Sequence, residues 1–239
     1  MKKMCIILIL LLILVMSGCS DKKNIIEDEV STSENDNYDI VKATYADKDI
    51  NINYPQISNL SDSDKQERIN KLIKTQALEV LEDYKDGISN LKFSMDFEIM
   101  YKGADLLSIQ YLGLSATKGA AFPINEFNTT NIDLAKEQLL TLTDVVTVND
   151  SFIEKFNSGK YKAYGSDLNL ESEGALSDAL TNFDDNDLIE SLKQQTSKFY
   201  FAKDSLVVSA EVAHVMGDHM EMEIKYDDLG DLLLLIPAQ

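Results

Sequence analysis

The sequence predicts an α+β protein with an antiparallel sheet of several strands, one long helix and shorter helices. Segments in which apolar and polar residues alternate, as in half-buried strands, occur both early and late in the chain. One long segment, residues 61–84, has apolar residues at spacings of three and four, which is typical of an amphipathic helix. Strands and helices do not alternate regularly, which argues against a parallel βαβ sheet. The chain contains no repeat with a period of about 20 to 50 residues, so the sequence does not predict a solenoid.

The chain begins with an export signal. Two lysines precede an apolar run from Met4 to Met16, and the small residues Ser17 and Gly18 follow it. A positive start, an apolar run and small residues are the three parts of a secretory signal peptide. At about 1.5 Å per residue the run forms a helix of about 20 Å, whereas a bilayer core is about 30 Å thick. We therefore expect residues 1–18 to be a signal peptide and not a permanent membrane span.

A cysteine, Cys19, follows the small pair directly. The segment Met16-Ser17-Gly18-Cys19 resembles the lipobox of bacterial lipoproteins, with methionine where leucine is commoner. The resemblance implies that the Cys19 thiol carries a diacylglyceryl group on the outer face of the cell membrane. Two acyl chains hold a protein far more firmly than one, at about 0.8 kcal/mol per buried methylene. The alternative is an ordinary signal peptide with an incidental cysteine.

Composition limits what the mature protein can be. Without residues 1–18 the chain has 221 residues, and its one remaining cysteine is the lipidated Cys19. Because no disulfide can form within the chain, a packed core must stabilise it. The signal holds two of the 22 basic residues and no acid, which leaves 20 basic and 41 acidic residues and a formal charge of −21. Such a surface repels nucleic acid and attracts cationic partners. The alternative is that the acidity only keeps an exported protein soluble.

The mature chain divides into a tether and a folded part. Residues 19–39 contain the lipidated cysteine and a polar, acidic segment that we expect to be a disordered tether. Residues 40–239 are expected to form the α+β extracellular domain. If this domain contains two subdomains, they span about 40–135 and 136–239.

The first half of the domain is predicted to contain a hairpin, a long helix and three further strands. Ile50, Ile52 and Tyr54 alternate with asparagines in the hairpin, and Pro55 is expected to end its second strand. Ser61 is expected to cap the helix and a glycine at 87 to close it. The predicted elements are strands 40–45 and 49–54, helix 61–84, and strands 91–101, 106–114 and 127–134.

The second half has weak patterns between residues 157 and 187 and clearer patterns afterwards. Thr141 to Asp144 indicates a turn that caps a short helix. Ala202-Lys203-Asp204 separates two apolar segments, which indicates a hairpin. The predicted elements are short helices at 141–148, 150–156, 174–181 and 186–195, strands at 198–201, 205–212 and 220–226, and a closing turn or helix at 227–235.

Three blocks of the chain, taken in order, resemble a known family. The first is I-N-I-N-Y-P-Q-I-S-N-L-S-D with its helix, residues 50–84. The second joins D-L-L-S-I, N-I-D-L and L-L-T-L-T-D-V-V between residues 105 and 146, and the third joins F-Y-F-A-K-D-S-L-V-V-S, E-V-A and M-E-M-E-I-K-Y-D-D-L between 199 and 229. They resemble the extracellular domain of the lysozyme-responsive anti-sigma factors of Gram-positive bacteria, a module that also precedes some peptidoglycan deacetylases.

The resemblance implies an α+β domain outside the cell and, in the sensor branch, direct recognition of lysozyme. We expect this chain to lack both the sigma-binding half and the deacetylase domain, so that it binds without relaying a signal. Two loops depart from the family pattern. A loop that is G-G-A-H in many relatives is Lys118-Gly119-Ala120-Ala121 here, and a loop of the type E-V-A-P-G-Y-M-G is shortened to residues 211–217, without proline or tyrosine. Partner specificity is expected to differ there.

Catalytic motifs are scarce, and we expect no enzymatic activity, no cofactor and no metal. The only histidines are His214 and His219, and no G-x-S-x-G occurs. With Asp218 they offer zinc ligands, but the spacing differs from H-E-x-x-H, so two loop histidines near the surface are the preferred interpretation. Asp184 to Asp187 is better explained as a helix cap than as a calcium loop. With 41 acids, a carboxylate pair for wall hydrolysis stays an alternative.

The preferred hypothesis is a binding protein whose partner is a cationic protein such as lysozyme, which it captures or blocks. An acidic exterior domain attracts a basic partner and complements its charge. The predicted partner-binding residues lie in the two departing loops and are Lys118, Phe122, His214, Val215 and Met216. The alternative for Phe122 and Met216 is that they only seal the end of the sheet. The alternative functions are a module that binds peptidoglycan and a wall hydrolase.

Overall fold

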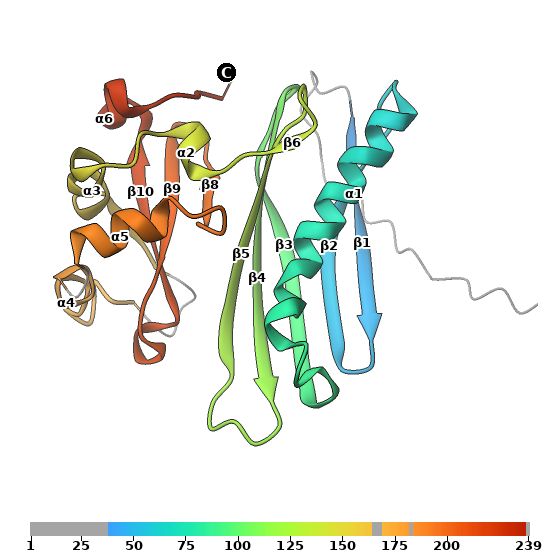
Figure 1. Ribbon diagram of the computed structural model, residues 1–239, viewed down its shortest axis with the longest axis horizontal. Coiled ribbons are helices and arrows are strands. Elements are labelled where there is room, and N and C mark those ends of the chain that lie inside the picture. The colour runs from blue at the N-terminus through green and yellow to red at the C-terminus, as the bar shows by residue number, and fades with distance from the viewer. Residues whose placement is uncertain (1–37, 164–168, 182–183, 238–239) are drawn as a thin grey trace, which may run out of the picture.

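The computed structural model describes residues 38–163, 169–181 and 184–237, and it confirms the α+β prediction. Four layers lie side by side: a long helix, a six-stranded sheet, a four-stranded sheet and a group of short helices (Figure 1). The predicted signal peptide, Cys19 and most of the predicted tether lie outside the described residues. In the part of the chain that is described, no helix is long and apolar enough to cross a membrane.

The first sheet has the strand order β1-β2-β3-β4-β5-β6. Its neighbouring strands are antiparallel, except for β2 and β3, which are parallel. The predicted strands are confirmed, most of them longer than expected, and the short strand β6 is an addition. The bounds are β1 (Asp39–Asp47), β2 (Ile50–Ser58), β3 (Leu91–Lys102), β4 (Leu106–Thr117), β5 (Ile124–Asp133) and β6 (Gln138–Leu139).

Helix α1 (Ser63–Glu79) covers one face of this sheet and buries Ile69, Ile73 and Ala77 against it. The cap is Asp62 and not the predicted Ser61, because the Asp62 carboxylate accepts hydrogen bonds from the first backbone N–H groups of the helix. The chain continues as the 3-10 helices η1 (Val80–Tyr84) and η2 (Ile88–Asn90). The predicted helix is therefore confirmed, with its last turn tightened to 3-10 geometry.

A side chain of α1 takes the place of a missing strand neighbour. Strands β2 and β3 pair only between Ile50–Ile52 and Phe93–Met95. Farther along β2, the Ile57 N–H donates to Asn70 Oδ1 at 2.7 Å, and Asn70 Nδ2 donates to the Ile57 carbonyl at 2.9 Å. The Asn70 amide thus completes the backbone hydrogen bonds of Ile57 as a neighbouring strand would.

The prediction that Pro55 ends the second strand is wrong, because β2 continues to Ser58. Along a strand, the backbone nitrogens of successive residues point to opposite edges, so the nitrogen of Pro55 lies on the same edge of β2 as the nitrogen of Ile57. Strand β3 has already separated from this edge. The absent N–H of proline therefore leaves no ladder hydrogen bond unmade, and the strand tolerates it.

The second sheet has the order β7-β10-β9-β8, and all its pairs are antiparallel. One face packs on the short helices through a second hydrophobic cluster that includes Phe152, Phe156, Met220 and Met222. The predicted elements here are confirmed, and β7 and η3 are additions. The bounds are β7 (Lys160–Lys162), β8 (Phe199–Phe201), β9 (Ser205–Glu211), β10 (His219–Lys225), α2 (Leu142–Val145), α3 (Asp150–Asn157), α4 (Leu176–Thr181), α5 (Asp185–Leu192), η3 (His214–Met216), α6 (Tyr226–Leu229) and η4 (Gly230–Leu232).

The Asp184 side chain accepts hydrogen bonds from the backbone N–H groups of Asn186 and Asp187, at the start of α5. The cap interpretation of this acidic segment is confirmed. Thr141 precedes α2 and is the donor there, because its N–H and hydroxyl both donate to the Asp144 carboxylate. Side-chain contacts at their first turns therefore stabilise both short helices.

The two sheets meet through buried polar side chains. The outer edge of β8 pairs with side chains of β4 and β5 instead of another strand. The Phe199 N–H donates to Thr129 Oγ1 at 3.2 Å, and the Phe199 carbonyl accepts from Asn131 Nδ2 at 2.7 Å. The Phe201 N–H donates to Ser108 Oγ at 3.0 Å, which in turn donates to Asn131 Oδ1 at 2.6 Å. We call Ser108, Thr129 and Asn131 the sheet junction.

A buried carboxylate lies beside the junction. Glu221 on β10 accepts hydrogen bonds from the Tyr200 hydroxyl at 2.7 Å and from Gln110 Nε2 at 3.2 Å. Burial, together with this carboxylate, raises the pKa of Tyr200 far above its usual range. The His219 ring stacks on Phe127 of β5 with centroids 4.4 Å apart and is only 6% exposed. The prediction that both histidines lie near the surface is therefore wrong for His219, because its ring is enclosed between the sheets.

Replacing Asn70 with alanine is expected to lower the free energy of unfolding by about 2 kcal/mol, because both backbone groups of buried Ile57 lose their partner. Urea denaturation followed by circular dichroism measures the change. The matched control is Lys71→Ala, an exposed position one residue along the same helix, which should change the value by less than about 0.5 kcal/mol. Equal effects of the two substitutions would contradict the role assigned to Asn70.

Candidate functional site

The two loops in which the chain differs from the family it resembles lie together at one end of the molecule (Figure 1). One connects β4 to β5, residues 118–123, and the other contains η3 between β9 and β10. The rings of Phe122 and His214 lie 5.7 Å apart, centroid to centroid, with an angle of 34° between their planes. We call the surface formed by Phe122, His214 and Val215 the two-loop surface.

Two large apolar side chains of this surface face solvent. Phe122 is 68% exposed and Val215 is 80% exposed. Phe122 therefore does not seal the end of the sheet. Large apolar side chains that remain exposed on two adjoining loops are a feature of many binding surfaces.

The other predicted residues lie elsewhere. Met216 is half-buried and packs against the hydrophobic cluster of the second sheet. For Met216, the structure therefore favours the alternative that it covers the end of the sheet. Lys118 is exposed at the start of its loop, where its N–H donates to the Asn90 carbonyl at 3.0 Å. The structure thus brings Phe122 and His214 together, leaves Val215 exposed next to His214 in the η3 loop, and places the backbone of Lys118 against η2.

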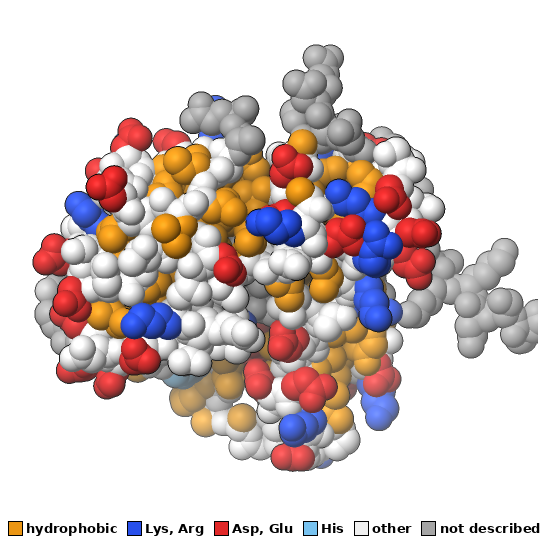
Figure 2. Space-filling view, turned by 45° about the horizontal axis from the view of Figure 1, so that its top comes forward, with side chains coloured by type: hydrophobic (Ala, Val, Ile, Leu, Met, Phe, Trp, Pro, Cys, Tyr) orange, Lys and Arg blue, Asp and Glu red, His pale blue; other side chains and the backbone are white. Residues whose placement is uncertain are grey.

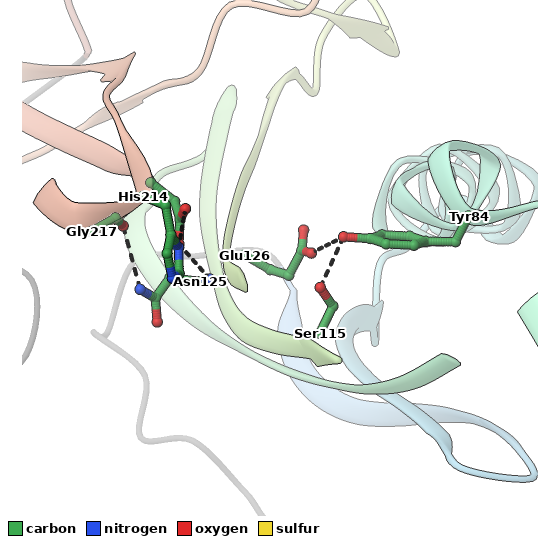
Figure 3. Close-up of polar contacts among 7 residues, drawn as sticks. Tyr84, Ser115, Asn125, Glu126, His214 and Gly217 are labelled. Atoms are coloured by element: carbon green, nitrogen blue, oxygen red, sulfur yellow. Dashed lines mark hydrogen bonds and ion pairs between the residues drawn. The ribbon is translucent and has the colours of Figure 1, made fainter. Parts of the chain in front are cut away.

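Asp218 ties the η3 loop to Asn125, the second residue of β5, directly after the other loop, and sequence reasoning did not predict this role. Its Oδ2 accepts from the Asn125 N–H at 2.8 Å, and its Oδ1 lies 2.8 Å from Nδ1 of His214. Asn125 Nδ2 also donates to the Gly217 carbonyl at 3.4 Å (Figure 3). The available signal was the Gly-Asp pair that ends the loop: Gly217 has φ of 102° and Asp218 has φ of 71°, both in the left-handed region.

The same segment of β5 is held from its other face. Glu126, the residue after Asn125, accepts a hydrogen bond from the Tyr84 hydroxyl, which also lies 2.8 Å from Ser115 Oγ (Figure 3). Burial and the Glu126 carboxylate raise the pKa of Tyr84 to about 12. The strand that carries the two-loop surface is therefore tied to η1 on one side and to the η3 loop on the other.

A hollow of about 400 Å³ opens on the face of the first sheet opposite α1. Most of its polar lining is neutral, because Asn51, Asn53 and Ser94 carry amides and a hydroxyl, while Asp96 is paired with Lys42 at 3.3 Å. The rest of the lining is Met95, Gly113 and two leucines, one of which, Leu114, is the register neighbour of Asn125 on β5. Sequence reasoning missed the hollow, because its polar residues alternate with buried ones and resemble a solvated strand face.

The zinc alternative is not supported by the geometry. His214 lies in the exposed loop, whereas His219 stacks on Phe127 between the sheets, so the two imidazoles do not converge with Asp218 on one point. Within residues 38–163, 169–181 and 184–237, no group of three or more histidine, cysteine or acidic side chains could hold a metal ion.

Comparison with known proteins identifies solved structures with a similar fold. No protein-family model matches the chain, and no curated protein matches it significantly. The solved structure of a DUF3298 family member from Bacteroides fragilis is similar, with a TM-score of 0.50 and 14% identity over 82% of this chain and 92% of that one. A DUF3298 family protein from Pseudomonas aeruginosa has a TM-score of 0.51 and 13% identity over 84% of this chain and 97% of that one. At these identities, the likeness establishes a shared fold.

Proposed function

We propose that this protein is a lipid-anchored binding protein on the outer face of the cell membrane, and that it binds a cationic protein of the lysozyme type. The observation that carries the proposal is the joining of two distant loops into one exposed surface. Asp218 ties the η3 loop to the start of β5, the His214 ring lies against Phe122 of the other loop, and Phe122 and Val215 remain exposed. Aromatic and aliphatic side chains on a rigid frame are the residues that contribute most to protein interfaces.

Charge supports a cationic partner. The predicted mature chain carries a formal charge of −21. Figure 2 shows acidic side chains over both halves of the visible face, with basic side chains interspersed among them. A basic protein is attracted by such a net negative charge. The resemblance to sensor domains that recognise lysozyme supports the same partner.

The hollow favours a second candidate function, the binding of peptidoglycan. Amide and hydroxyl groups on rigid strands suit the hydroxyl and amide groups of a neutral sugar chain. This ligand contacts the face of the first sheet and not the two-loop surface. The two candidate functions therefore depend on different residues.

Replacing Phe122 with alanine is expected to weaken the binding of a basic lysozyme at least about tenfold, because an exposed aromatic anchor is lost. The protein to use is the soluble mature chain, residues 19–239 with Cys19→Ser, and titration calorimetry at low and high salt measures the affinity. The matched control is Ile236→Ala, an equally exposed apolar residue outside the two-loop surface. Absence of wild-type binding at micromolar concentration would remove the proposed function.

Replacing Asn53 with leucine is expected to abolish retention on purified cell walls if the second candidate function is correct, because the hollow loses an amide that hydrogen-bonds sugar groups. A pull-down with lysozyme absent measures retention of the soluble mature chain. Phe122→Ala is the control, and it should leave retention unchanged. Failure of the wild-type chain to sediment with walls would exclude this candidate.

Replacing Cys19 with serine is expected to move the protein from the membrane fraction to the soluble fraction, because the proposed lipid has no other attachment point. Cell fractionation followed by immunoblotting measures the distribution. Cys5→Ser is the control, since Cys5 lies inside the predicted signal peptide and its loss should leave the protein on the membrane. A serine variant that stays membrane-bound would contradict lipid anchoring.

A further inference from the structure

We propose that Asp218 holds the uncharged His214 ring as the tautomer protonated on Nδ1, so that Nε2 presents a hydrogen-bond acceptor, and that the partner contacts it with an arginine or lysine side chain. This inference rests on the proposed function, because it specifies the group that the two-loop surface requires of its partner. It makes His214 a specificity-determining residue and Asp218 a positioning residue.

The tautomer follows from the partners of the Asp218 carboxylate. A carboxylate only accepts hydrogen bonds, so the ring nitrogen 2.8 Å from its Oδ1 must carry the proton. The other oxygen accepts from the Asn125 backbone N–H at 2.8 Å, and a backbone N–H always donates. Both oxygens are therefore engaged, and in the uncharged ring Nε2 of His214 has a free lone pair.

The ring is also held in direction. Phe122 packs against it from the other loop, and the side chain of Asp218 is only 16% exposed, whereas that of His214 is 48% exposed. Gly217 and Asp218 adopt consecutive left-handed conformations, which turn the chain so that the carboxylate lies beneath the ring. A polar group that is positioned before binding costs little entropy when the partner arrives.

The surroundings of Nε2 decide the partner's chemistry. A partner that covers Phe122 and Val215 also covers His214, and a buried acceptor without a donor is costly. The negative charge of Asp218 lies behind the ring, so it favours a donor that is positively charged. A guanidinium is both a hydrogen-bond donor and positively charged. It can also stack on the Phe122 ring, as arginine does on aromatic faces.

The decisive variant is Asp218→Asn in the soluble mature chain. The amide oxygen still accepts from the Asn125 N–H, but its NH₂ group donates to His214 Nδ1 and so moves the ring proton to Nε2. Long-range ¹⁵N–¹H spectra of histidine at mildly alkaline pH should show the Nδ1–H tautomer in the wild type and the Nε2–H tautomer in the variant. Lysozyme affinity should fall at least about tenfold, because a donor then faces a donor.

Two further variants complete the experiment. His214→Phe keeps a ring against Phe122 but removes the acceptor, and it should lose the same affinity as Asp218→Asn. Asp228→Asn makes the same charge change in α6, beyond the opposite end of β10, and should change affinity less than about twofold. An Nε2–H tautomer in the wild type overturns the inference. Undiminished lysozyme binding by Asp218→Asn overturns it as well but leaves the proposed function standing, whereas absence of wild-type binding overturns both.

Discussion

Side chains that replace missing strand neighbours hold this structure together. The outer edge of β8 has no strand beside it, and the sheet junction residues Ser108, Thr129 and Asn131 satisfy its backbone groups. Asn70 does the same for Ile57 after β3 separates from β2. Each of these backbone groups is buried, and leaving one unpaired costs about 1–3 kcal/mol. The arrangement of the layers therefore depends on a few polar side chains in specific places.

This constraint gives the molecule its layered organisation. Two hydrophobic clusters lie on the outer sides of the two sheets, one beneath α1 and one beneath the short helices. Between the sheets the contacts are directional, and they include the Glu221 carboxylate with its donors Tyr200 and Gln110. Hydrogen bonds specify one orientation, whereas apolar contacts tolerate several. The β5 strand and the η3 loop are thereby placed close enough for Asn125 to reach Asp218.

The strands and helices of the fold follow largely from sequence periodicity. The burial of a polar sheet face by a distant strand does not. Alternation of buried Phe93 and Met95 with polar residues predicts β3, and the three- and four-residue spacing predicts α1. The same alternation gives no sign that the polar face of β4 and β5 is buried, since Ser108 and Thr129 are typical of a solvated face. Their partners on β8 are 93 and 70 residues away in sequence, respectively. A pattern within one strand identifies a face, but it does not reveal which distant strand edge covers it.

The candidate site, like the fold, was predictable from the sequence only in part. Differences from the family that the chain resembles pointed to Phe122, His214 and Val215, whereas the role of Asp218, which ties the η3 loop to β5, depends on a contact with Asn125 across 93 residues. Strand alternation then explains why the site is firm, because Asn125 faces the η3 loop while the adjacent Glu126 faces Tyr84. One short segment of β5 thus anchors both layers beside it. A recognition surface built on such a segment loses little freedom on binding, so its exposed side chains can act as anchors although they lie in loops.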